Sequence, residues 1–195
     1  GVATMTLLAA DSYTVTLSRI PPGFAAKESY TFTSTAVNIN LSTLSIIDPT
    51  DHSKANYKVG GNIGDFTLTD TNGETYALSK LLKDKDLVIL NFWFVNCGPC
   101  KSEFPHFEEV SQGYENIQLL TLNPIDNVSA IRNFKDQNGY SFPMISDHIG
   151  LSAGFNVSAY PTTVFIDSSG RIIAIDVGAY PSQQALENRI NSLLK

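Results

Sequence analysis

Hydrophobic and polar residues alternate along this chain in two different ways, and the change divides the sequence into two regions. In residues 1–57 short runs alternate with a period of two, as in Tyr13-Thr14-Val15-Thr16-Leu17, which is typical of strands with one solvated face. Further runs of this kind are Tyr30-Thr31-Phe32, Val37-Asn38-Ile39-Asn40-Leu41 and, less regularly, Leu44-Ser45-Ile46-Ile47. We therefore expect a small β-rich N-terminal region or domain over residues 1–57, with no evident chemistry of its own.

From residue 58 onward, strand patterns alternate with helix patterns. A hairpin is predicted over residues 66–78, with Asn72-Gly73 in its turn, and a short helix follows it. Strands are predicted at 87–95, 117–122, 162–167 and 171–177, and helices at 101–110, 128–138, 150–155 and from Ser182 to the end. This alternation predicts an α/β domain over residues 58–195, in which a mixed central sheet is flanked by helices on both faces.

The overall composition narrows the classes of partner. Of the 195 residues 43% are hydrophobic and 16% charged, as in an ordinary globular protein. The net charge of −6 argues against nucleic acid or an anionic membrane as the main partner. The sequence has no run near the ~18–20 apolar residues of a membrane span. Its start lacks the basic and apolar segments of a signal peptide, so a removed signal or a lipid anchor upstream of residue 1 stays open.

The only two cysteines stand in one motif, Cys97-Gly98-Pro99-Cys100. Two thiols at this spacing can close into a disulfide and reopen, exchanging electrons with a partner's thiols without a metal or an organic cofactor. The motif lies between a predicted strand and a predicted helix, where the partial positive charge of the helix N-terminus favours the thiolate. We expect Cys97, the first and more exposed cysteine, to attack the substrate and Cys100 to resolve the mixed disulfide.

Two other readings of the cysteine pair stay open at this point. The pair could form a purely structural disulfide, or it could supply half of a zinc site. Zinc needs about four ligands, and the three histidines, His52, His106 and His148, are scattered along the sequence. We therefore predict no metal site.

Residues ~57–195 resemble the TlpA/ResA type of thioredoxin-fold proteins, the bacterial extracytoplasmic thiol-disulfide oxidoreductases. The resemblance rests on stretches in the family's order: 64–70 with Asn72-Gly73, Leu90-Asn91-Phe92-Trp93, 97–105, and 160–167 with Gly170. It implies a thioredoxin-like fold, a redox-active Cys97–Cys100 disulfide without a further cofactor, and protein thiols or disulfides as substrates. It also implies an upstream thiol electron donor and a periplasmic location, either free or membrane-anchored.

By the same resemblance, Pro161 is the cis-proline that faces the cysteine motif. A cis bond there would present the backbone of Tyr160 to an extended substrate segment; the alternative is an ordinary trans proline at a strand start. We include Trp93 and Asn96 among the expected substrate-binding residues. Asn96 stands where thioredoxins usually have tryptophan, so the expected substrate surface is more polar than theirs.

Glu103 is the third candidate for the chemistry. It follows Cys100 by three residues and so returns to nearly the same helix face. In the resembling family a glutamate at this position manages protons during exchange, and partial burial near sulfur would raise its pKa. Asn91, where cytoplasmic thioredoxins have a buried aspartate, cannot act as a base. The alternative is that Glu103 is solvated, like Glu108 and Glu109.

The dipeptide Gly98-Pro99 bears on the direction of electron flow, since the same pair separates the cysteines of thioredoxin. We therefore predict a reductase or isomerase of protein disulfides rather than an oxidase. Two other functions remain as alternatives. A peroxiredoxin-like peroxidase would need a threonine and an arginine beside its cysteine, yet Val95-Asn96 offers no threonine. A non-catalytic assembly module would use residues 1–57 to recruit a partner.

Overall fold

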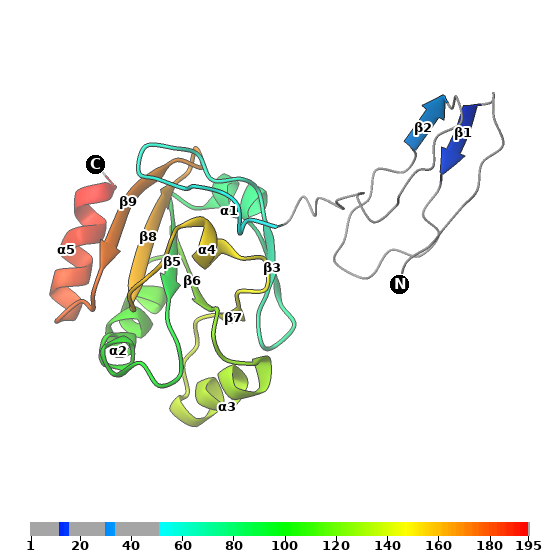
Figure 1. Cartoon of the computed structure of the whole chain (residues 1–195). Helices are drawn as coiled ribbons and strands as arrows, with labels where there is room; N and C mark the ends of the chain where they lie inside the picture. Colours follow the sequence, from blue (N-terminus) through cyan, green and yellow to red (C-terminus); the bar gives the residue numbers. More distant parts are fainter. Residues whose placement is uncertain (1–11, 16–29, 34–50, 195) are drawn as a thin grey trace. The chain divides into compact units, whose positions relative to one another are not determined.

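The computed structural model describes residues 12–15, 30–33 and 51–194, and it divides the chain into two units, Gly1–Asp51 and His52–Lys195 (Figure 1). In the first unit β1 (Ser12–Val15) pairs with β2 (Tyr30–Thr33) in antiparallel fashion. The predicted strands at 37–41 and 44–47 lie outside the described residues.

The boundary between the units falls after Asp51 rather than after residue 57, where the pattern had placed it. Residues 52–57 belong to the second unit because their backbone is hydrogen-bonded to it. The amide of His52 donates to the carbonyl of Ile149 at 2.8 Å, and the amide of Tyr57 donates to the carbonyl of Gly154 at 2.9 Å.

A five-stranded mixed sheet in the order β7-β6-β5-β8-β9 forms the centre of the second unit. Its strands are β5 (Leu87–Phe92), β6 (Ile117–Asn123), β7 (Met144–Ser146), β8 (Thr162–Asp167) and β9 (Ile172–Val177). β5, β6 and β7 run parallel, whereas β8 is antiparallel to both β5 and β9. The predicted mixed sheet is thus confirmed.

Helices cover both faces of this sheet, as Figure 1 shows. One hydrophobic cluster holds the buried side chains of α2 (Gly98–Gly113), α3 (Val128–Asn138) and α5 (Gln183–Leu193). The opposite cluster holds those of α1 (Leu78–Asp84), α4 (Leu151–Gly154) and the hairpin of β3 (Thr67–Thr69) and β4 (Thr75–Ala77). No helix among the described residues is both long and apolar enough to cross a bilayer.

The central strand β5 explains how the sheet presents side chains to the site. All six of its residues are buried, as expected of a strand covered on both faces. Its side chains alternate between the faces, so that Leu87 and Ile89 join the cluster of α2, and Val88 and Leu90 join the opposite one. By the same period of two, Asn91 faces α2.

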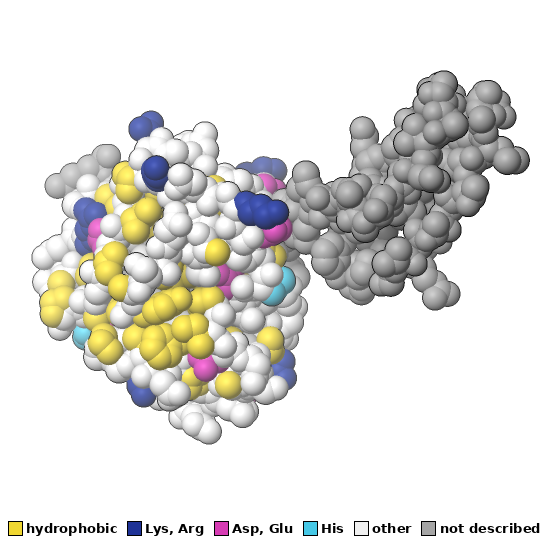
Figure 2. All heavy atoms as spheres, in the orientation of Figure 1, with side chains coloured by type: hydrophobic (Ala, Val, Ile, Leu, Met, Phe, Trp, Pro, Cys, Tyr) yellow, Lys and Arg dark blue, Asp and Glu magenta, His cyan; other side chains and the backbone are white. Residues whose placement is uncertain are grey.

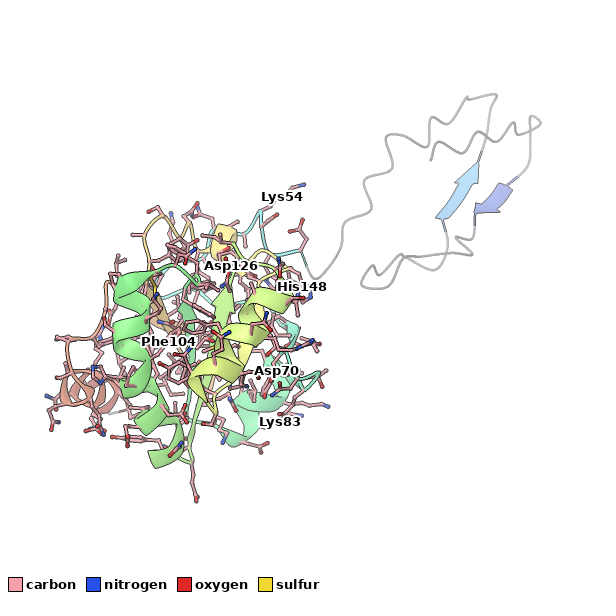
Figure 3. The ribbon with its side chains drawn as sticks, turned by 90° about the horizontal axis from the view of Figure 1, so that it is seen from below. Lys54, Asp70, Lys83, Phe104, Asp126 and His148 are labelled. Atoms are coloured by element: carbon pink, nitrogen blue, oxygen red, sulfur yellow. A yellow bond between two sulfur atoms is a disulfide. The ribbon has the colours of Figure 1, made fainter. Side chains whose placement is uncertain are left out.

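The strand predicted at 87–95 is too long at its end. β5 stops at Phe92, and the following residues form the loop that leads into α2, which begins at Gly98 rather than at Lys101. In the core, Phe104 of α2 lies between that helix and α3 (Figure 3). Its ring contacts Trp93 edge to face, with 5.0 Å between the ring centroids.

Candidate active site

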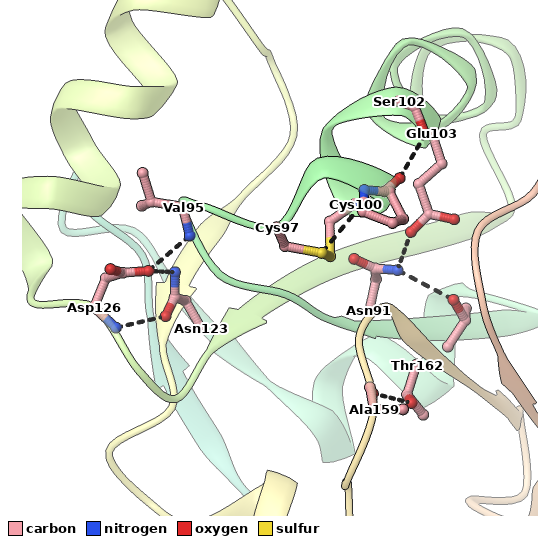
Figure 4. The surroundings of a disulfide bond; sticks show 12 residues. Asn91, Val95, Cys97, Cys100, Ser102, Glu103, Asn123, Asp126, Ala159 and Thr162 are labelled. Carbon is pink, nitrogen blue, oxygen red and sulfur yellow. Dashed lines mark hydrogen bonds between the residues drawn. A yellow bond between two sulfur atoms is a disulfide. The ribbon is translucent and has the colours of Figure 1, made fainter.

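The two cysteines lie where β5 passes into α2, and they form a disulfide (Figure 4). Their Cα atoms are 5.3 Å apart. Cys97 is the N-cap residue of α2, and its sulfur accepts a hydrogen bond from the amide of Cys100 at 3.2 Å. Cys97 is 3% exposed and Cys100 is fully buried, so of the two residues only Cys97 borders the surface.

The start of α2 gives this sulfur an electropositive environment. The first amides of a helix have no partner within it and carry a partial positive charge. One of them, that of Cys100, points at the Cys97 sulfur, and this contact would stabilise a thiolate after reduction. Gly98 and Pro99 are both exposed in the first turn, and the missing N–H of Pro99 costs little there.

Asp126 holds the loop that precedes the motif. Its Oδ2 accepts from the amide of Val95 at 2.7 Å and from the Asn123 side chain at 2.9 Å. The Oδ1 of Asn123 in turn accepts from the amides of Ile125 and Asp126. The end of β6 thereby fixes the backbone immediately before Cys97.

We expect Asp126→Ala to lower the free energy of unfolding by about 1–2 kcal/mol, because it leaves the half-buried Val95 amide without its acceptor. Urea unfolding of the oxidised protein measures this change. Asp136→Ala, which removes an exposed carboxylate from α3, is the matched control and should change the free energy little. Equal stability of both variants would contradict the assigned contact.

Glu103 is fully buried, so the alternative of a solvated glutamate is wrong. Its Oε1 accepts from the Asn91 side chain at 2.9 Å, and its Oε2 accepts from the backbone amide of Tyr180 at 3.0 Å. Burial, which disfavours the charged carboxylate, raises the pKa of Glu103 to about 7, although both hydrogen bonds act in the opposite direction. Such a carboxylate can both accept and release a proton near neutral pH.

Asn91 connects this carboxylate to the sheet. Its Nδ2 donates to Glu103 and also to the Thr163 hydroxyl of the neighbouring strand β8, at 3.1 Å. Within the described part of the chain, the buried Oδ1 of Asn91 accepts no hydrogen bond. Asn91 therefore serves as a donor to Glu103, a role that an aspartate at this position could not fill when ionised.

The peptide bond between Tyr160 and Pro161 is cis, as the resemblance implied, and the trans alternative is wrong. Tyr160 is half-buried, and its ring contacts Phe94 of the β5–α2 loop edge to face at 5.4 Å. The Pro161 carbonyl accepts from the amide of Gly178 at 2.9 Å. The loops before α2 and before β8 thus meet beside the motif.

Two of the expected substrate-binding residues, Asn96 and Trp93, differ from each other in exposure. Asn96 is exposed next to Cys97, where a substrate can reach it. Trp93 is completely buried and packs against Phe104 and Phe134, each with 5.0 Å between ring centroids. Trp93 is therefore a core residue, and its expected contact with substrate is wrong.

The surface around this junction is largely apolar. In Figure 2 hydrophobic side chains gather in a patch between the positions that α2 and α3 occupy in Figure 1. Ile125 (59% exposed) and Val128 (45% exposed) lie in the segment of Asp126, which is bonded to Val95. Val177 (69% exposed) is paired with Thr162, immediately after Pro161. Exposed apolar side chains therefore lie on two segments that are bonded to the loop before the motif and to the strand after Pro161.

The contacts of Tyr180, Asp126 and Thr163 were not predicted. Tyr180 lies 77 residues beyond Glu103 in the sequence, and it donates through its backbone, which leaves no signal in the residue type. Thr163 is paired with Asn91 across β5 and β8, so its contact depends on the register of these strands. Only the sheet topology brings these groups together.

The comparisons with known proteins agree with one another. The model of the AhpC/TSA family matches residues 59–175. The thiol-disulfide oxidoreductase ResA of Bacillus subtilis is 33% identical over 129 residues, which cover 64% of this chain and 70% of the relative. ResA of Halalkalibacterium halodurans is 29% identical over 133 residues, covering 67% of this chain and 74% of the relative.

Solved structures show the same likeness in three dimensions. The crystal structure of the pneumococcal exposed lipoprotein thioredoxin Etrx1 from Streptococcus pneumoniae superposes with a TM-score of 0.60 and 27% identity. The match covers 67% of this chain and all of that structure (100%). These likenesses show that the chain has a thioredoxin-like fold.

Proposed function

This chain belongs to the AhpC/TSA family and is a thiol-disulfide oxidoreductase of the ResA/TlpA type, and we propose that it reduces or isomerises protein disulfides through Cys97 and Cys100. The observation that carries this proposal is the disulfide at the N-terminus of α2 with the buried Glu103 beside it on the same helix. Its substrates and redox partners are protein thiols and disulfides.

The proposed reaction begins with the reduced protein. The Cys97 thiolate attacks one sulfur of a substrate disulfide, forming a mixed disulfide and releasing the first substrate thiolate. The Cys100 thiol then loses its proton to the Glu103 carboxylate. The resulting Cys100 thiolate attacks the Cys97 sulfur, closes the intramolecular disulfide and releases the second substrate thiolate. Two electrons pass to the substrate, and the thiolates take protons from solvent and from Glu103.

A thiol donor completes the cycle. It reduces the Cys97–Cys100 disulfide by the reverse pair of exchanges and is itself oxidised to a disulfide. The reduced cysteine pair carries both electrons, so the proposed cycle needs no metal and no organic cofactor. In the described part of the chain, no group of three His, Cys, Asp or Glu side chains is placed to hold a metal ion.

Insulin reduction by the full chain, with dithiothreitol as the donor, tests this function. We expect turnover that depends on Cys97. Hydrogen peroxide consumption by the same sample distinguishes the peroxidase alternative, because a peroxidase would consume peroxide faster than it reduces insulin. Failure of the protein to reduce any protein disulfide would contradict the proposal.

The direction of electron flow is proposed to be reductive. The Gly98-Pro99 pair, which also separates the cysteines of thioredoxin, supports this direction. The amide that points at Cys97 stabilises the thiolate of the reduced form and so acts in the opposite sense, raising the potential. We expect a midpoint potential below about −180 mV and closer to the about −270 mV of thioredoxin. Equilibration with defined dithiothreitol ratios measures it; a potential near about −120 mV would indicate an oxidase.

We also propose that the protein works outside the cytoplasm. The likeness to an exposed lipoprotein thioredoxin supports this location. A thiol reagent that does not cross membranes should label the reduced Cys97 in intact cells. Labelling only after lysis would contradict the location.

A further inference from the structure

The segment between β9 and α5 contacts both sides of the thiol site. The amide of Gly178 donates to the carbonyl of Pro161 at 2.9 Å, and the amide of Tyr180, two residues on, donates to Glu103 Oε2 at 3.0 Å. One short stretch of backbone therefore connects the proline that borders the motif with the buried carboxylate. A change in the position of this segment would alter the hydrogen bond that Glu103 receives.

The side chain of Tyr180 anchors this segment. Its hydroxyl donates to Asp176 Oδ2 at 2.7 Å, and its ring packs edge to face on Phe107 of α2, with 6.3 Å between centroids. Asp176 is the penultimate residue of β9, so the phenol is tied to the rigid sheet. Burial and the neighbouring Asp176 carboxylate raise the pKa of Tyr180, and its hydroxyl therefore stays a donor.

Arg189 of α5 holds Asp176 in turn. Its Nε donates to Asp176 Oδ2 at 2.7 Å and its Nη2 to Oδ1 at 2.8 Å, which is the two-pronged geometry that fixes a carboxylate plane. The guanidinium also lies over the ring of Phe165, 5.9 Å from the centroid. Because the two charges are opposite, the pair anchors Tyr180 while adding no net charge beside the site.

We propose that Tyr180, with Asp176 and Arg189 behind it, positions the proton acceptor of the exchange reaction by keeping a backbone N–H directed at Glu103. This inference rests on the proposed function of Glu103 and deepens it. The three residues are positioning residues, since they act through Glu103. An N–H donor stabilises the ionised carboxylate, so the anchor sets the pH at which Glu103 can accept a proton from Cys100.

Two groups donate hydrogen bonds to Glu103, the side-chain amide of Asn91 on β5 and the backbone amide of Tyr180 in the connecting segment. The charged groups behind Tyr180 are Asp176 on β9 and Arg189 on α5, and the two cysteines precede Glu103 on α2. In the oxidised protein the cysteines do not titrate. A titration of that form therefore reports Glu103 without interference from thiols.

The test uses Tyr180→Phe in the full-length oxidised protein, with the Glu103 carboxyl followed by NMR through ¹³C-labelled glutamate and assigned with Glu103→Gln. Loss of the phenol anchor weakens the hydrogen bond that the Tyr180 backbone amide donates to Glu103. We therefore expect the pKa of Glu103 to rise by about 0.5–1 unit. After reduction, the acidic limb of the pH profile for insulin reduction should move in the same direction by a similar amount.

Tyr140→Phe is the matched control, since Tyr140 is a half-buried tyrosine stacked on Phe142 and supplies neither of the hydrogen bonds to Glu103, so it should leave the titration unchanged. Arg189→Lys keeps the charge but loses the two-pronged contact, and should give a smaller shift of the same sign. An unchanged Glu103 titration in both Tyr180→Phe and Arg189→Lys overturns the inference. Inactivity of the parent protein toward insulin would instead overturn the proposed function.

Discussion

Cys97→Ser is expected to abolish insulin reduction, whereas Cys100→Ala is expected to accumulate mixed disulfides with protein substrates. Cys97 is the cysteine that borders the surface, and its sulfur accepts the hydrogen bond of a helix amide, so without it no intermediate can form. Without the buried Cys100, the intermediate forms but has no internal thiol to resolve it. Both effects should be all-or-none, since serine and alanine cannot exchange with a disulfide.

Non-reducing electrophoresis followed by mass spectrometry of the trapped species measures the second effect. Ser102→Ala, an exposed change in the same helical turn, is the control and should neither trap partners nor lose turnover. Equal trapping by Cys97→Ala and Cys100→Ala would contradict the roles assigned to the two sulfurs. Full activity of Cys97→Ser would leave the pair as a structural disulfide.

The reactive motif could be predicted from the sequence because its determinants are local. A buried apolar run, two cysteines at a spacing of three and a following amphipathic stretch define a strand, a helix start and a cap within about one turn of each other. The sheet and its helices followed from the same periodic patterns. The matched stretch around Pro161 added the cis bond, which periodicity alone does not reveal.

The environment of Glu103 could not be predicted, because it depends on long-range packing. Its donors come from β5 and from the segment after β9, and these meet only when β8 pairs antiparallel with β5 and then with β9. The prediction that Trp93 contacts substrate is wrong for a related reason. An aromatic residue directly after a strand can face either substrate or core, and here the rings of Phe104 and Phe134 hold it inside.

Glu103→Gln is expected to make the protein more stable at alkaline pH and slower as an enzyme. Burial raises the pKa of Glu103 from 4.5 to about 7 in the folded protein. A carboxylic acid whose folded pKa is raised contributes stability that is complete below its unfolded pKa and is lost as the pH rises through the folded value. Between pH 4 and pH 9 the free energy of unfolding of the parent should therefore fall by about 3 kcal/mol relative to that of the variant, in which residue 103 does not titrate.

Urea unfolding of the oxidised proteins at pH 4, 7 and 9 measures this difference, and Glu109→Gln on the exposed face of α2 is the control that should show none. A glutamine amide placed against the Tyr180 amide loses a hydrogen bond, which lowers the stability of the variant at every pH without changing the slope. In turnover, the variant has no carboxylate to accept the Cys100 proton, so resolution should slow by about 100-fold near neutral pH. If the variant gains stability relative to the parent as the pH rises but its turnover is unchanged, Glu103 is not the proton acceptor of the reaction. Cys100 would then lose its proton to water.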